Sequence, residues 1–176
     1  WERLGLDRLL RSLAVEDGVK PAYERALLAM VANRLSVEPS SKLGVWERWV
    51  ETVHLPDCWG LARDDMYEAM DLLHAHRERV EEAVFFEPAN LYNLEVDLIF
   101  FDTTTASFSV DEGDEEDEEG PGLRQRGHAK TGDWAVQVVV ALAVTREGLP
   151  VRSWVFPGNT ADVSVVQRVR EDLRGW

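Results

Sequence analysis

One acidic residue stands where it could carry chemistry. A nearly continuous apolar run over residues 96–101 is typical of a strand buried on both faces, and Asp102 follows it directly. We expect the strand to end at Asp102, which would leave the carboxylate rigidly held and open to substrate. A carboxylate at such a position suits a hard divalent cation, because these cations prefer oxygen ligands. The alternative is that Asp102 only begins a turn.

Other pairs of potential ligands have less suitable spacing. His54 and Cys58 are four residues apart, but Pro56 lies between them and a structural zinc site needs four ligands. His74 and His76 are two apart in an expected helix and would point away from each other. Since Cys58 is the only cysteine, no internal disulfide can form, which fits a reducing cytoplasm. We expect Cys58 to be a half-buried structural thiol.

Charge is unevenly distributed along the 176 residues. The net charge is -14, which argues against binding nucleic acid through overall charge. Residues 111–119 read DEGDEEDEE, eight acids in nine positions, and the rest of the chain carries only -6. We expect a solvated acidic loop there, with a steering or autoinhibitory role as the alternative. No apolar run is long enough for a membrane span, and no secretion leader is visible.

The elements that would position Asp102 change in kind near Pro88. Residues 1–88 have apolar side chains at helical spacing and predict a helical region. The expected helices are one around 6–13, one opened by Pro21, one capped by Ser40 or Ser41, and a long one over 64–86 that Pro88 ends.

Residues 89–176 predict strands at 96–101, 134–144 and 151–156, followed by a helix over 161–173. The last two strands would form a hairpin around residues 146–148. Asn159 or Thr160 would cap the helix, and Asp162 would favour its positive end rather than act as a second catalytic acid. The RNase H-like fold begins in this order, with its first acid on the first strand and its second after the fourth. The expected fold class is therefore mixed α+β or α/β, with the chain stopping before that fourth strand.

Three segments in this half have distinctive sequences: VDLIFFDTTT at 96–105, QRGHAK at 125–130 and FPGNTAD at 156–162. In this order they resemble the Asp-Thr-Thr, Gly-Tyr-Ser-Lys and Pro-Gly-Asn motifs of DDE transposases of bacterial insertion sequences, in the group named after the IS-four elements. The intervening hairpin is also similar to that family. Further likeness to its helical N-terminal region lies in Arg34-Leu35, Pro39-Ser40-Ser41-Lys42 and Trp46.

The resemblance implies a transposase that cleaves and transfers DNA strands at insertion-sequence ends. Asp102 would be the first of three carboxylates that hold two Mg²⁺ ions about 4 Å apart. Arg126, His128 and Lys130 would contact the backbone of double-stranded DNA. The region 1–88 would bind DNA ends or form a homodimer, and 89–176 would be an incomplete RNase H-like catalytic domain in a cytoplasmic, nucleoid-associated protein.

Some features depart from the family pattern. Lys130 is followed by Thr131 and Gly132 where the family often has Asp, and neither the second Asp nor the Glu occurs within these residues. The chain alone is therefore expected to be catalytically inactive. One alternative is a transposase remnant that acts as a noncatalytic DNA-binding or protein-interaction module. Another is a different RNase H-like nuclease, such as a resolvase.

Overall fold

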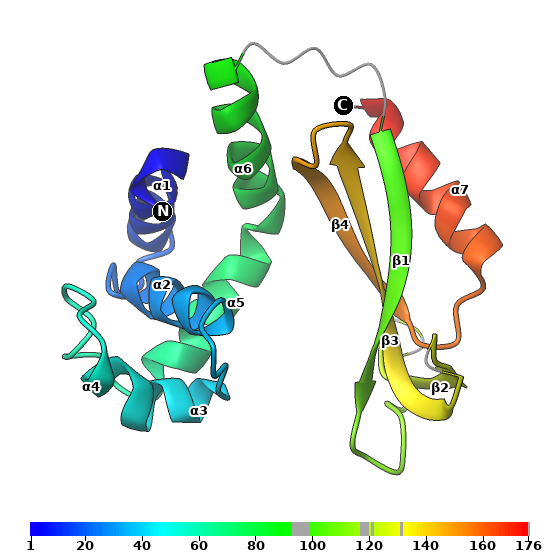
Figure 1. Ribbon diagram of the computed structural model, residues 1–176, viewed down its shortest axis with the longest axis horizontal. Coiled ribbons are helices and arrows are strands. Elements are labelled where there is room, and N and C mark those ends of the chain that lie inside the picture. Colours follow the sequence, from blue (N-terminus) through cyan, green and yellow to red (C-terminus); the bar gives the residue numbers. More distant parts are fainter. Residues whose placement is uncertain (93–98, 117–119, 121, 131, 176) are drawn as a thin grey trace. The chain divides into compact units, whose positions relative to one another are not determined.

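The computed structural model describes residues 1–92, 99–116, 120, 122–130 and 132–175 (Figure 1). The chain is mixed α+β and divides into two compact units, Trp1–Asn93 and Leu94–Trp176. We call these unit 1 and unit 2. The division falls after Asn93 rather than at the expected 88, and each unit is described by itself below.

Unit 1 is helical, and its core is formed by apolar side chains that recur at helical spacing, among them Leu10, Leu13, Leu27 and Met66. Its elements in chain order are η1 (Glu2–Leu4), α1 (Leu6–Glu16), α2 (Tyr23–Arg34), α3 (Lys42–Gly44), the π-helical turn η2 (Val45–Trp49), α4 (Val50–Thr52), α5 (Asp65–Ala75) and α6 (Arg77–Tyr92).

Two helix boundaries in unit 1 differ from the sequence-based expectation. The single helix expected over 64–86 is broken at His76, whose φ of -111° and ψ of 23° lie outside the helical region. Pro88 lies inside α6 instead of ending it, although its ring removes one backbone donor and crowds the preceding turn. The expected cap is confirmed at Ser41, whose hydroxyl accepts a hydrogen bond from the Gly44 N–H at 3.2 Å.

A buried carboxylate ties the first two helices of unit 1 together. The Glu24 side chain is fully buried and accepts hydrogen bonds from Arg11 Nε at 3.0 Å and from Arg25 Nε at 2.6 Å. The Trp1 indole N–H donates to the same carboxylate at 2.5 Å. Several donors around one buried charge compensate for the water that it has lost.

Unit 2 contains an antiparallel four-stranded sheet and one long helix. Strand β3 (Trp134–Thr145) is central. It pairs on one side with β1 (Ile99–Phe108), and on the other with β2 (Gln125–His128) and β4 (Pro150–Pro157). The β3–β4 hairpin confirms the expected one, and Gly148 provides the positive φ of 83° in its turn. Sequence reasoning did not predict β2.

The expectation that the first strand ends at Asp102 is wrong. Asp102 is the fourth residue of β1, which continues to Phe108 because Thr103, Thr104 and Thr105 are β-branched and pair with β3. Nor are the described residues of β1 buried on both faces: half-buried and exposed side chains alternate from Ile99 to Thr104. Residues 96–98 of the expected strand lie outside the described residues.

Helix α7 (Asp162–Asp172) follows the sheet and is continued by the short turn η3 (Leu173–Gly175). The helix lies along one face of the sheet (Figure 1), with Val165 and Val169 buried and the Trp154 indole N–H donating to Asp172 Oδ2 at 2.8 Å. Its N-cap is Ala161, which makes no side-chain cap bond, so the expected cap at Asn159 or Thr160 is wrong.

Within the described residues, we find no helix with both the length and the apolar character required to cross a membrane.

Candidate functional site

A cavity of about 350 Å³ lies in unit 2 where four segments of the chain meet. Three of these segments belong to the three motifs noted in the sequence, and the fourth is β3. We call it the unit 2 cavity. Its lining comprises Thr103 and Thr105 from β1, Arg126, Gly127 and His128 from β2, Lys130 after β2, Trp134, Gln137 and Val139 from β3, and Gly158, Asn159, Thr160 and Ala161 before α7.

Two glycines make this convergence possible. A Cβ on Gly158 would lie 2.0 Å from the carbonyl oxygen of Gln137 and 2.4 Å from that of Gln125. A Cβ on Gly127 would lie 2.1 Å from the carbonyl oxygen of Gly158. Only glycines at both positions therefore let the turn before α7 rest directly on the backbones of β2 and β3.

Gln137 also holds the turn before α7 in place. Its side-chain amide donates to the Gly158 carbonyl at 2.9 Å, and the residue is only 1% exposed. Its Oε1 is buried and has no hydrogen-bond partner among the described residues. A buried acceptor without a partner is costly, so a donor bound in the cavity, such as a water or a ligand hydroxyl, would be stabilised there.

Lys130 joins the cavity to Asp102. Its backbone N–H donates to Thr105 Oγ1 at 3.2 Å, and its ammonium group donates to the Thr103 carbonyl. The same ammonium lies 3.5 Å from Asp102 Oδ1. Because the Asp102 side chain is 94% exposed, this ion pair is well solvated and contributes little to stability.

Asp102 itself does not line the cavity. Successive residues of a strand point to opposite faces, so Asp102 lies on the face opposite Thr103 and Thr105, both of which line the cavity. Its carboxylate accepts a hydrogen bond from the Thr103 N–H at 2.8 Å, and the side chain is otherwise exposed to solvent. The side chain is accessible, as a catalytic role requires, but it reaches the cavity only through Lys130.

The described residues do not form a magnesium site. No group of three or more His, Cys, Asp or Glu side chains that could hold a metal ion occurs among them. Asp102 offers one carboxylate, and the charged group described beside it is the Lys130 ammonium. A two-metal centre needs several carboxylates around the ions, so Asp102 could be at most one of its ligands.

The three basic residues expected to contact DNA do gather at the unit 2 cavity, since Arg126, His128 and Lys130 all line it. No aspartate or glutamate is among its described lining residues. Sequence reasoning missed Trp134, which is 69% exposed and packs edge-on against His128 at 5.9 Å between ring centroids. An exposed tryptophan beside basic residues is the signal that could have indicated it.

The beginning of the acidic block is anchored rather than free. The Asp114 carboxylate accepts hydrogen bonds from the Arg124 backbone N–H at 2.8 Å and from Arg124 Nε at 2.6 Å. These bonds lower the pKa of Asp114 below its ordinary value. Residues 117–119 of the block lie outside the described residues. Within 111–116 most residues are exposed, as expected for a solvated loop.

Comparison with known proteins identifies no relative: no family model, no curated protein and no solved structure matches this chain.

Proposed function

We propose that this chain is part of a DDE transposase that cleaves and transfers DNA strands at insertion-sequence ends, and that the unit 2 cavity holds a phosphate group of the DNA backbone. One observation carries the proposal. The three segments that resemble transposase motifs are far apart in the sequence of unit 2, yet they converge on one cavity that no described acidic side chain lines.

The strand arrangement supports an RNase H-like fold for unit 2. Three of its strands, β1, β3 and β4, follow one another antiparallel in the sheet, and α7 comes next in the chain. Among the described strands β1 pairs only with β3, so its outer edge is open. In the RNase H-like order, a fourth strand after the helix would pair parallel to β1 at this edge and bring the second acid beside Asp102. The short β2 is an addition to that pattern.

The charges in unit 2 also suit a local phosphate site. Apart from the block 111–119, residues 94–176 carry eight acidic and eight basic residues, so the block accounts for the unit's net negative charge. Arg126 and Lys130 supply permanent positive charge at the cavity, and Thr105 and Thr160 supply hydroxyl groups. Charged and hydroxyl donors of this kind form most contacts to DNA phosphates and fix the position of the duplex.

Asp102 is proposed as the first of the three catalytic carboxylates, with Mg²⁺ as the cofactor of the complete active site. The other ligands would have to come from outside the residues that the structure describes. Unit 1 is proposed to contact DNA ends or a second copy of the chain.

The test measures binding of a fluorescein-labelled 12-base-pair duplex by anisotropy at several salt concentrations. Lys130→Gln is expected to weaken binding about threefold to tenfold and to reduce the slope of log K against log salt by about one, because one phosphate contact is lost. The matched control Arg170→Gln removes the same charge from an exposed position of α7 outside the cavity. Equal effects of the two substitutions, or none from Lys130→Gln, would remove the cavity from the proposal.

Catalysis is tested on the complete gene product with Asp102→Asn in a metal-dependent strand-cleavage assay. Loss of cleavage with unchanged DNA binding is expected, because the substitution removes one negative charge and a metal ligand without removing a phosphate contact. Cleavage at the original rate would show that Asp102 has no catalytic part.

A noncatalytic remnant is the second candidate, and one observation favours it. Asp102 has a lysine ammonium 3.5 Å away and belongs to no described group of three or more side chains that could hold a metal ion. The sequence that follows residue 176 in the gene separates the two candidates. An apolar strand ending in Asp, followed at a distance by a helical Glu, supports the enzyme, whereas a nearby stop codon supports the remnant.

A further inference from the structure

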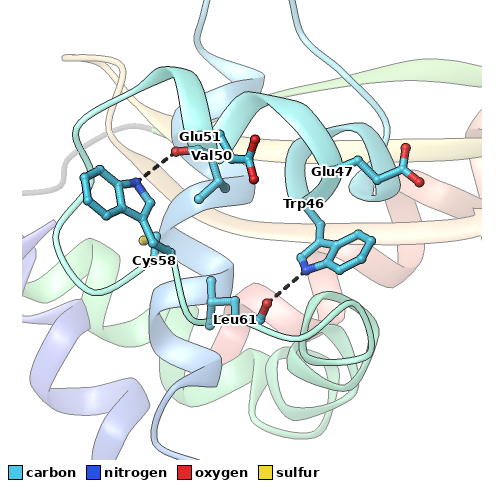
Figure 2. A pocket seen from close by; sticks show the side chains of 7 residues that line it. Trp46, Glu47, Val50, Glu51, Cys58 and Leu61 are labelled. Carbon is cyan, nitrogen blue, oxygen red and sulfur yellow. Dashed lines mark hydrogen bonds between the residues drawn. The ribbon is translucent and has the colours of Figure 1, made fainter.

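Unit 1 contains a cavity of about 630 Å³ that the proposed function does not use. We call it the tryptophan pocket. It is formed by η2, α4 and the loop that leads toward α5, and Figure 2 shows Glu47 and Glu51 at one rim with Leu61 across from them. Its lining comprises Trp46, Glu47, Val50, Glu51, Cys58, Trp59 and Leu61.

The two indole rings of the pocket are held in place by backbone hydrogen bonds. The Trp46 N–H donates to the Leu61 carbonyl at 2.9 Å, and the Trp59 N–H donates to the Val50 carbonyl at 3.1 Å; Figure 2 marks both bonds. Because both N–H groups are satisfied, the rings offer a ligand their π surfaces rather than a donor. Trp59 is nevertheless 69% exposed, so a large ring is held rigidly at the surface.

The floor of the pocket is neutral. Val50, Cys58 and Leu61 are all buried. The Cys58 thiol lies 3.7 Å from the Arg25 carbonyl and 3.6 Å from the Pro56 carbonyl, and burial raises its pKa, so it stays uncharged. Charge in the pocket therefore comes from its rim alone.

That rim carries two carboxylates. Glu47 and Glu51 are exposed, lie one turn apart, and make no hydrogen bond or ion pair with any described residue. The nearest arginines are turned elsewhere: Arg25 is bound by Glu24, and the Arg48 guanidinium lies toward Gly44 on another side of the helix. Glu47 lies within the π-helical turn η2 and Glu51 follows it in α4; π-helical turns are rare and are frequently found at functional sites.

We propose that the tryptophan pocket binds an arginine side chain of a basic partner polypeptide. A guanidinium group stacks on indole faces and donates to carboxylates through its planar fork, so its chemistry matches both kinds of side chain in the pocket. A nucleic acid does not fit this pocket, because its phosphates would meet Glu47 and Glu51. Residues 1–93 as a whole carry 17 acidic and 11 basic residues, which also favours a basic partner.

The test uses the whole chain labelled with ¹⁵N and the indole N–H resonances of its tryptophans, with Trp46 and Trp59 assigned by phenylalanine substitution. The probe is the peptide acetyl-Gly-Arg-Gly-Arg-Gly-amide. Its control peptide has citrulline at both arginine positions, which keeps the shape and removes the charge. We expect the arginine peptide to shift the Trp46 and Trp59 resonances while the other tryptophans change little, and the citrulline peptide to shift neither.

Two double variants separate the pocket from general charge attraction. Glu47→Gln with Glu51→Gln should weaken binding of the arginine peptide about tenfold, because both rim charges are lost next to the rings. Glu38→Gln with Glu82→Gln removes the same charge from exposed positions outside the pocket and should change binding less than twofold. Neither pair is buried, so folding is expected to be unaffected.

Four results would overturn the proposal. One is an equal response of all tryptophan resonances to the arginine peptide, which would indicate attraction to the acidic chain as a whole. The second is equal weakening by the two double variants, and the third is equal binding of the citrulline peptide. The fourth is a dependence of the free protein's Trp46 and Trp59 resonances on its own concentration, which would assign the pocket to a second copy of the chain.

Discussion

Replacing Gly158 by alanine tests whether close backbone contact builds the unit 2 cavity. The added Cβ would lie 2.0 Å from the Gln137 carbonyl oxygen and 2.4 Å from the Gln125 carbonyl oxygen. Both obstacles are strand backbone, which cannot rotate away as a side chain can. The turn before α7 must therefore retreat by about 1.5 Å to regain ordinary contact distance.

The cost follows from that displacement. Overpacking of a rigid site costs about 1–3 kcal/mol, and the upper end applies because the obstacles are backbone atoms. Losing the buried bond from the Gln137 amide to the Gly158 carbonyl adds about 1 kcal/mol. Unit 2 is then expected to lose about 3–4 kcal/mol of unfolding free energy, which corresponds to a midpoint lower by about 12 °C or more.

The assay is urea unfolding followed residue by residue in ¹H–¹⁵N spectra, which reports the two units separately. Gly60→Ala is the control, because a Cβ there meets nothing within 4 Å, and its effect should stay within about 0.5 kcal/mol. Gly127→Ala intrudes on the same gap, so the double variant with Gly158→Ala should cost less than the sum of the two single variants. An unchanged urea midpoint of unit 2 in Gly158→Ala, or strictly additive free energies of unfolding in the double variant, would refute this account of the cavity.

Further predictions concern two ion pairs, one buried and one exposed. Glu24→Ala should destabilise unit 1 by about 3–5 kcal/mol in urea unfolding, because it leaves Arg25 without its carboxylate. Arg11→Gln should cost far less, since the Arg11 side chain is half exposed. Comparable losses from the two variants would contradict this ranking. Arg124→Gln should raise the pKa of Asp114 toward its ordinary value in a ¹³C carboxyl titration. Since the pKa of Asp114 is lowered in the folded chain, its bond to Arg124 stabilises the fold at pH values above the unfolded pKa. This stabilisation is lost as the pH falls through the folded pKa. An unshifted Asp114 titration in the variant would count against the bond.

Local patterns predicted the parts of the fold that local energetics decide. Apolar spacing predicted the helices of unit 1, and the turn before Leu149 predicted the β3–β4 hairpin, because Gly148 suits a positive φ. The strand β2 escaped prediction because it is short and its Gly127 and His128 give no alternating apolar pattern. Asp102 resembles a strand end by its residue type, but pairing with Leu142 of β3 overrides that weak preference.

The candidate site was predictable in its charges and not in its construction. Arg126, His128 and Lys130 were visible as a basic cluster in an acidic chain, and the structure places all three at one cavity. What sequence could not indicate is that Gly127 and Gly158 approach each other, because close contact between distant segments leaves no periodic pattern. The same holds for Asp102, whose mid-strand place on the opposite face depends on the pairing register.

At Thr103, the backbone groups on the unpaired edge of β1 are bonded to side chains of the same chain. The Thr103 N–H is bonded to the Asp102 carboxylate and its carbonyl to the Lys130 ammonium, so both groups that a further strand would use are already occupied. Such occupancy guards unit 2 against unwanted association through this strand. Any segment that extends the sheet here must displace the lysine, and in doing so it would release the carboxylate from its counter-ion. Extension of the sheet and loss of the ion pair between Lys130 and Asp102 would then occur together.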